Sequence, residues 1–150
     1  MIRRSTLRIL LLFYILVVSY YTVIGREPSD NYKLELLPFK TIIDFFNVGY
    51  EGHGQYILHE VFLNFVLLMP VGAILGCSST LSKNDVCIRK VFPFGFLISL
   101  LIETFQLITK TGTFEVDDLI YNTLGCAMGY LICIGILPVC LRHKNKTKPL

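Results

Sequence analysis

Four blocks of apolar residues, separated by polar stretches, dominate the pattern along the chain. The blocks cover residues 7–24, 58–77, 91–108 and 119–141. Each is about 20 residues long, which at about 1.5 Å per helical residue is enough to cross a hydrocarbon core of about 30 Å. Because backbone polar groups in lipid must bond within the segment, each block is predicted to be a helix. The pattern predicts an all-α fold, an integral membrane four-helix bundle, forming a single domain over residues 1–150.

The distribution of Lys and Arg predicts the orientation of this bundle. With the N-terminus inside, ten of the 14 basic residues fall on the inner side, since only Arg26, Lys33, Lys40 and Lys110 fall outside. Short loops rich in Lys and Arg stay in the cytoplasm. We therefore expect a multi-pass membrane protein with the N-terminus and C-terminus cytoplasmic. Residues 25–57 would form a long external loop, and residues 142–150 an unstructured basic tail beside anionic lipid.

The first block has a second interpretation, because Arg3, Arg4 and Arg8 make a positively charged region at its start, as in a signal peptide. No small-x-small cleavage site follows, which favours a retained helix.

Hydrophobic residues make up 53% of the composition, in keeping with lipid as a partner. The chain has no P-loop and no Rossmann glycine pattern, so we expect no cofactor and no nucleic acid. Cys126, Cys133 and Cys140 recur every seven residues and are expected to act as small apolar residues on one helix face.

Polar residues gather at the ends of three predicted helices that all face outward in this orientation. Each helix carries a pair at helical spacing whose two members share one face, and the last helix also carries Asp117 directly before its pair. The residues are Glu60 and Asn64, Glu103 and Gln106, and Asp117, Asp118 and Asn122. Since ionisable groups are unfavourable against lipid, we expect them to face one another and line a shallow external pocket.

Structural roles could explain several of these residues as well. Asp117 or Asp118 could cap the last helix, and Glu60 could do the same for the second. Asn64 and Gln106 could hydrogen-bond neighbouring helices. Glu103 is least easily explained in this way, because an acid is unfavourable near the C-terminal end of a helix. His59 is expected to be a solvated loop residue or an interfacial residue.

Glycine and proline residues predict how the helices pack. Gly125 and Gly129 form a GxxxG pattern on the same stripe as Asp118 and Asn122. Such a pattern lets another helix approach closely, either within the chain or in a homo-oligomer formed through the last helix. Pro70 with Gly72 is expected to kink the second helix.

Four sequence elements in order resemble the VanZ-like family of small bacterial membrane proteins. They are ELLPFKTI (35–42), LNFVLLMPVG (63–72), ETFQ (103–106) and FEVDDLIYNTLGCAMG (114–129). The resemblance covers residues 35–131. Glu35 and Glu115 replace an asparagine and an aspartate of the family pattern, and Thr111, with Lys110 beside it, stands where the family commonly has arginine.

The resemblance implies a membrane protein associated with lowered susceptibility to the glycopeptide teicoplanin, by an envelope mechanism that is not established. The first hypothesis is a non-enzymatic protein whose pocket binds a lipid-linked envelope precursor or a lipoglycopeptide. The second is an intramembrane enzyme on a lipid-linked or phosphorylated substrate, in which Glu60, Glu103, Asp117 and Asp118 hold a divalent cation or act as acid and base. Catalytic residues stay unknown, and no His/Cys cluster predicts a metal. The third is a structural or assembly protein.

Overall fold

The computed structural model describes residues 4–24, 33–48, 54–82 and 88–146. Within them, four helical segments are long and apolar enough to cross a membrane: Ser5–Thr22, Gln55–Ser79, Ile88–Thr109 and Val116–Ile136. They are built from α1 (Arg4–Ser19) with a π-helical turn η1 (Tyr20–Ile24), from α3 (Gln55–Leu67) with α4 (Met69–Ser82), from α5 (Ile88–Thr109), and from α6 (Val116–Lys146). The prediction of a four-helix membrane bundle is confirmed.

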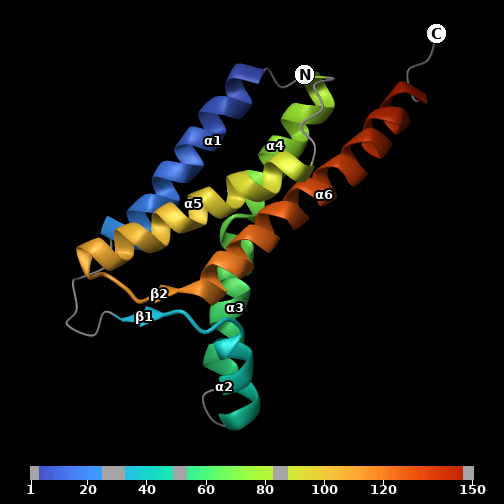
Figure 1. Cartoon of the computed structure of the whole chain (residues 1–150). Coiled ribbons are helices and arrows are strands. Elements are labelled where there is room, and N and C mark those ends of the chain that lie inside the picture. Colours follow the sequence, from blue (N-terminus) through green and yellow to red (C-terminus); the bar gives the residue numbers. More distant parts are fainter. Residues whose placement is uncertain (1–3, 25–32, 49–53, 83–87, 147–150) are drawn as a thin grey trace.

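Helix α6 is the central element of the bundle. It packs against α4, α5 and α3, while α1 packs against α4 (Figure 1). Its membrane-length segment is more buried than those of the other three helices. The core is a cluster of small and medium-sized side chains, namely Val18, Leu68, Val71, Val91, Ile102, Cys126 and Tyr130. Because lipid tails are as apolar as this core, close packing rather than water exclusion holds the spans together.

Glycines set the distance between α6 and the α3–α4 segment. A Cβ added to Gly125 would lie 1.7 Å from the carbonyl oxygen of Phe65, and one added to Gly129 would lie 1.9 Å from that of Met69. From the other side, a Cβ on Gly72 would lie 1.7 Å from the carbonyl oxygen of Cys126. Gly125 and Gly129 of the GxxxG pattern therefore pack against the α3–α4 segment of the same chain.

The second membrane segment is interrupted, close to the predicted kink. Leu68 lies between α3 and α4 with φ −99° and ψ 2°, and its N–H donates to the carbonyl of Val66. Pro70 has no N–H for the carbonyl four residues earlier, so a regular helix cannot continue there. The Tyr14 hydroxyl of α1 donates to the Leu67 carbonyl at 2.7 Å. A neighbouring helix thus satisfies one backbone group at the break.

The segment predicted as an external loop contains a short strand and a short helix that the hydrophobic pattern did not predict, and the strand that pairs with the first one was not predicted either. Strand β1 (Leu34–Glu35) pairs in parallel with β2 (Phe114–Glu115), and helix α2 (Lys40–Val48) follows β1. Pro38 and Phe39 form the turn between β1 and α2, where Phe39 has φ 62°. The expectation of an unstructured tail from residue 142 is wrong in part, because α6 continues to Lys146.

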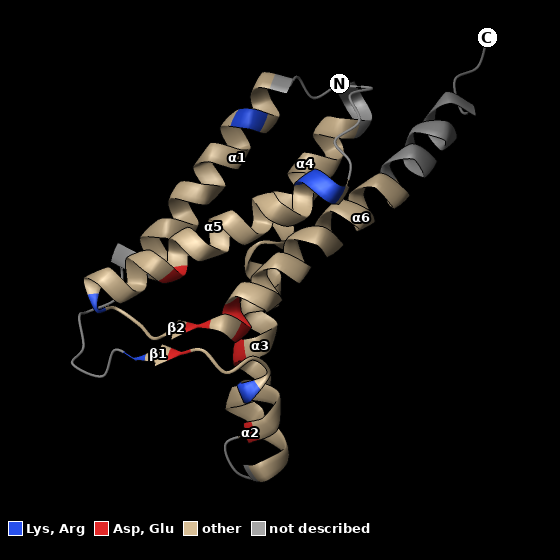
Figure 2. Cartoon of the chain, viewed as in Figure 1, with Lys and Arg blue, Asp and Glu red and all other residues tan. Residues whose placement is uncertain are grey.

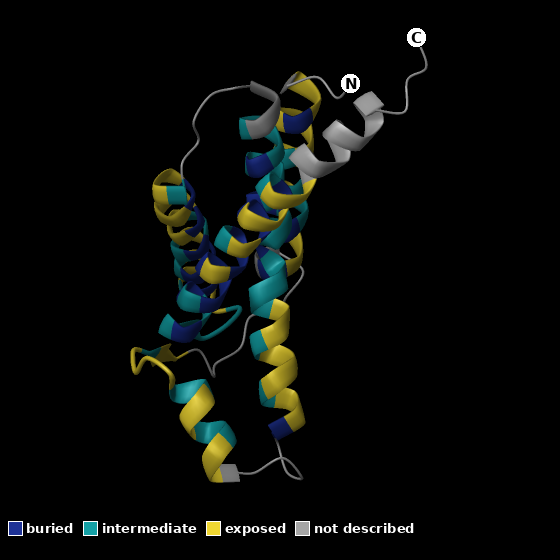
Figure 3. Cartoon of the chain, turned by 90° about the vertical axis from the view of Figure 1, so that its right-hand side faces the viewer, coloured by how far each residue is buried: buried dark blue, intermediate teal, exposed yellow. Residues whose placement is uncertain are grey.

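Acidic residues gather at one end of the bundle, around β1, β2 and α3, whereas basic residues lie at both ends (Figure 2). Those near the starts of α1 and α5 lie at the opposite end from the acids, and Lys40 and Lys110 lie at the start of α2 and just after α5, at the acidic end. Large apolar side chains of α1 such as Ile9, Phe13 and Leu16 are exposed on the outside of the bundle, which suits contact with lipid. Exposed residues also cover much of α2 and the first half of α3 (Figure 3).

The cysteines differ from the expectation of simple apolar residues. Cys77 of α4 and Cys133 of α6 form a disulfide with their Cα atoms 6.0 Å apart. Cys126 is buried and unpaired, as expected, under Gly95 of α5. The side chain of Cys140 lies outside the described residues. The seven-residue spacing could not reveal the disulfide, because the partner of Cys133 is 56 residues away.

Candidate functional site

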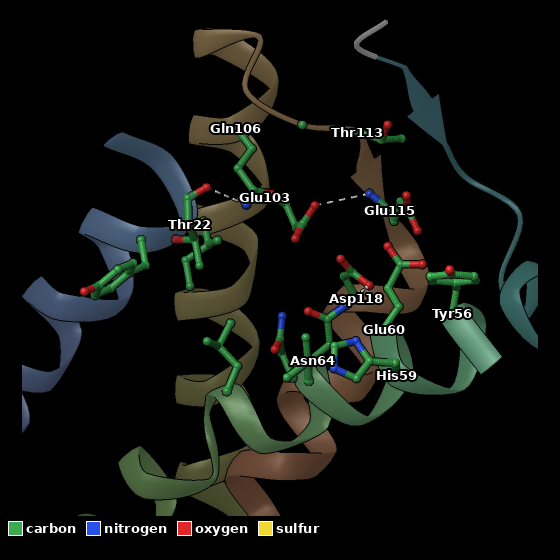
Figure 4. A pocket seen from close by; sticks show the side chains of 16 residues that line it. Thr22, Tyr56, His59, Glu60, Asn64, Glu103, Gln106, Thr113, Glu115 and Asp118 are labelled. Atoms are coloured by element: carbon green, nitrogen blue, oxygen red, sulfur yellow. Dashed lines mark hydrogen bonds between the residues drawn. The ribbon is translucent and has the colours of Figure 1, made fainter. Parts of the chain in front are cut away.

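A cavity of about 710 Å³ lies at the acidic end of the bundle, between η1, α3, α5, β2 and the start of α6. Figure 4 shows side chains from these elements pointing toward the same space. The lining residues are Tyr21, Thr22, Tyr56, His59, Glu60, Leu63, Asn64, Leu67, Ile102, Glu103, Gln106, Gly112, Thr113, Glu115, Asp118 and Asn122.

The deep part of the cavity is formed by buried polar side chains of α5 and α6. Glu103 is 2% exposed and Asn122 is 1% exposed. Asn122 donates from Nδ2 to Ser99 Oγ at 3.1 Å, and Ser99 in turn lies 3.5 Å from the Asp118 carbonyl. The Oδ1 atom of Asn122 is buried and has no partner among the described residues. A buried acceptor without a donor is costly unless water or a ligand supplies one.

Hydrogen bonds fix the other polar side chains to neighbouring elements. Asn64 of α3 donates from Nδ2 to Asp118 Oδ1 of α6. Gln106 donates from Nε2 to the Thr22 carbonyl at 2.9 Å, which joins α5 to η1 (Figure 4). The Glu103 carboxylate accepts the N–H of Glu115 at 3.2 Å, which joins α5 to β2. The cavity wall is therefore held by contacts between distant parts of the chain.

The rim of the cavity carries exposed groups from the first two turns of α3. Tyr56, His59 and Glu60 are all exposed there. Glu115 is half-buried beside them, and burial together with the nearby carboxylates of Glu60 and Glu35 raises the pKa of its carboxyl above the ordinary value. The cavity is therefore acidic and accessible at its rim, and buried polar side chains form its floor.

Asp117 departs from the sequence-based expectation, because it does not line this cavity. Its carboxylate accepts the N–H of Phe39 at 2.5 Å, the N–H of Thr41 at 2.8 Å and the Thr41 hydroxyl at 2.6 Å. These donors lie at the start of α2, where a carboxylate caps the helix and complements its dipole. Asp117 is therefore the anchor of the ELLPFKTI element, 78 residues away from Phe39 in sequence.

The structure brings the other six predicted pocket residues into one cavity: Glu60, Asn64, Glu103, Gln106, Asp118 and Asn122. Sequence reasoning missed Tyr21, Thr22, Tyr56 and Thr113, and placed His59 only in a solvated loop or at the interface. Glu115 was noted only as a variant of the family pattern. Lys110 and Thr111, at the position of the family's arginine, are not lining residues. Instead they end α5, with Lys110 at φ 58° and Thr111 donating its N–H to the Gln106 carbonyl at 2.9 Å.

The carboxylates and His59 do not make a metal centre. In the parts of the chain that the structure describes, no three His, Cys, Asp or Glu side chains converge closely enough to hold a metal ion. The cavity also presents no Ser–His or Cys–His pair among its lining residues. What the arrangement offers is hydrogen-bonding and negative charge in a recess at one end of a membrane bundle.

Together, the four spans and the polar recess define a multi-pass helical membrane protein. A family model described as VanZ/LLP1 matches residues 6–139, and the chain belongs to this family. The resemblance seen in the sequence is thereby confirmed. Searches of curated proteins and of solved structures return no significant match.

Proposed function

We propose that this protein is a non-enzymatic component of the bacterial cell envelope that lowers susceptibility to teicoplanin. Its cavity would bind the polar part of a lipid-linked precursor or of a lipoglycopeptide at the outer surface of the cell membrane. Both termini would then lie in the cytoplasm. The family membership supports a membrane protein of this kind, and the link to the drug comes from the resemblance to the VanZ-like family.

The observation that carries the proposal is the polar cavity of about 710 Å³. A volume of this size falls within the range of typical small-molecule sites. It lies beside apolar helix faces that contact lipid, so a molecule anchored in the membrane can place its polar group there. Buried polar residues within a span are also costly enough that a binding role is a reasonable default.

The test is drug susceptibility of a sensitive bacterial host that expresses the protein. We expect the minimum inhibitory concentration of teicoplanin to rise above that of the vector control. Glu103→Gln and Asn64→Ala should reduce this rise, because both side chains line the cavity. Asp44→Asn, an acid of α2 outside the cavity, should leave it intact.

Membrane levels of each variant must be equal for the comparison to count. If the protein is present in the membrane and neither teicoplanin nor vancomycin susceptibility changes, the proposed function is wrong. Orientation is tested separately by labelling single cysteines introduced at residues 60 and 146 in intact cells. Labelling at residue 146 without permeabilisation would reverse the proposed topology.

A further inference from the structure

Several hydrogen-bond donors around the cavity are already engaged within the protein. The amide of Asn64 donates to Asp118, that of Asn122 to Ser99, and that of Gln106 to the Thr22 carbonyl. The backbone N–H of Glu115 donates to Glu103. The donors held by these contacts cannot serve a ligand unless an internal hydrogen bond breaks.

Acceptors are in excess on the same wall. Four carboxylates line the cavity, those of Glu60, Glu103, Glu115 and Asp118, and no Lys or Arg is among the described lining residues. The Oδ1 atom of Asn122, a residue 1% exposed, adds an acceptor that has no donor among the described residues. A carboxylate and an amide oxygen are acceptors only, so the wall calls for a ligand that donates.

We propose that the cavity binds a protonated amine carried by its ligand. An ammonium group has three donors, no acceptor and a positive charge, and so it matches a wall rich in acceptors and negative charge. A phosphate or pyrophosphate is the opposite in each respect and would meet repulsion here. This inference rests on the proposed function and specifies the chemical class of the bound group.

The apolar part of the wall indicates what the amine is attached to. Leu63, Leu67 and Ile102 line the cavity beside the acids, and they belong to helical segments long and apolar enough to cross a membrane. An ammonium joined to an alkyl chain would satisfy both surfaces at once. Burial, together with the neighbouring carboxylates of Glu60 and Glu35, raises the pKa of Glu115 even though Lys40 acts in the opposite direction.

The experiment uses the full-length protein in phosphatidylcholine nanodiscs and measures binding by isothermal titration calorimetry. The probes are dodecylamine and dodecyl phosphate, with empty nanodiscs as the blank. We expect dodecylamine to bind at least about tenfold more tightly than dodecyl phosphate, because the ammonium donates hydrogen bonds to the acidic wall and the phosphate cannot. Asp118→Asn and Glu60→Gln should each weaken amine binding, and Asp44→Asn should not.

Glu60 is exposed, so Glu60→Gln keeps the test available if Asp118→Asn does not fold. Equal binding of the two probes would overturn the proposal, as would an equal loss in Asp44→Asn and Glu60→Gln. Competition by short-chain phosphatidylethanolamine would identify a lipid headgroup as the source of the amine, and competition by butylamine a soluble one. Amine binding without any change in drug susceptibility would refute only the proposed function. A Glu103-dependent change in susceptibility without amine binding would refute only this inference.

Discussion

Replacing Gly125 by alanine tests the packing that holds α6 against the second membrane segment. The new methyl carbon would lie 1.7 Å from the carbonyl oxygen of Phe65, where contacts below 3.0 Å essentially never occur. The obstacle is backbone rather than a side chain that can rotate away. The two helices must therefore separate by more than an ångström, and core contacts of Leu68 and Val71 with α6 would loosen with them.

The expected cost follows from two opposing effects. Overpacking a tight site costs about 1–3 kcal/mol, whereas replacing glycine by alanine inside a helix gains about 0.5–1 kcal/mol. Gly125→Ala should therefore be destabilising by about 1–2 kcal/mol. Gly135→Ala is the matched control on the same helix, because a Cβ there meets nothing within 4 Å. Gly135→Ala should therefore show only the stabilisation of about 0.5–1 kcal/mol expected when alanine replaces glycine inside a helix.

Equilibrium unfolding in mixed micelles with increasing dodecyl sulfate measures both variants under identical conditions. Gly129→Ala, whose Cβ would lie 1.9 Å from the Met69 carbonyl oxygen, should behave like Gly125→Ala. If Gly125→Ala and Gly135→Ala unfold at the same detergent fraction, the tight packing at Gly125 does not stabilise the protein. The same conclusion follows if Gly125→Ala lowers stability only by forming dimers, which size-exclusion chromatography of the same samples would detect.

Three further outcomes are expected. Lys110→Gly should be about 1 kcal/mol more stable than Lys110→Ala in the same unfolding assay, because residue 110 has φ 58° just after the end of α5 and only the alanine variant keeps a Cβ there. Asp117→Ala should speed tryptic cleavage after Lys40 by at least about tenfold, because the three hydrogen bonds from Phe39 and Thr41 at the start of α2 are lost. Asp44→Ala, the control, should leave the cleavage rate unchanged. The raised pKa of Glu115 means that its contribution to stability is fully present below the unfolded-state pKa of about 4.3 and is lost as pH rises through the higher folded-state pKa. Glu115→Gln should flatten that part of the stability–pH profile, and an unchanged profile would contradict the assignment.

The membrane spans could be predicted because hydrophobicity is a property of each segment alone. Residues that interrupt a helix can also be recognised from the local sequence, as Pro70 predicts the break at Leu68. The β1–β2 pair and α2 could not be predicted in the same way. A strand of two residues has no periodicity, and β1 and β2 lie almost 80 positions apart in sequence. The Cys77–Cys133 disulfide was missed for the same reason.

The residues that line the cavity could be predicted only where two conditions were both met. Helical spacing placed Glu60 with Asn64 and Asp118 with Asn122 on common faces, and the predicted orientation put those faces at one depth. Asp117 was predicted to line the cavity and does not, because neighbouring positions on a helix point about 100° apart and Asp118 is the one that faces the cavity. Lining residues such as Tyr21 and Tyr56 carry no polar signal stronger than that of any interfacial tyrosine.

The adjacent carboxylates of Asp117 and Asp118 serve different parts of the molecule. One is bound to the loop segment before α2, and the other is bound to Asn64 in the cavity wall. A single peptide unit joins them, so a turn of the α6 terminus about its own axis would displace both. A ligand that displaced Asp118 would therefore be expected to shift Asp117 and the start of α2 with it.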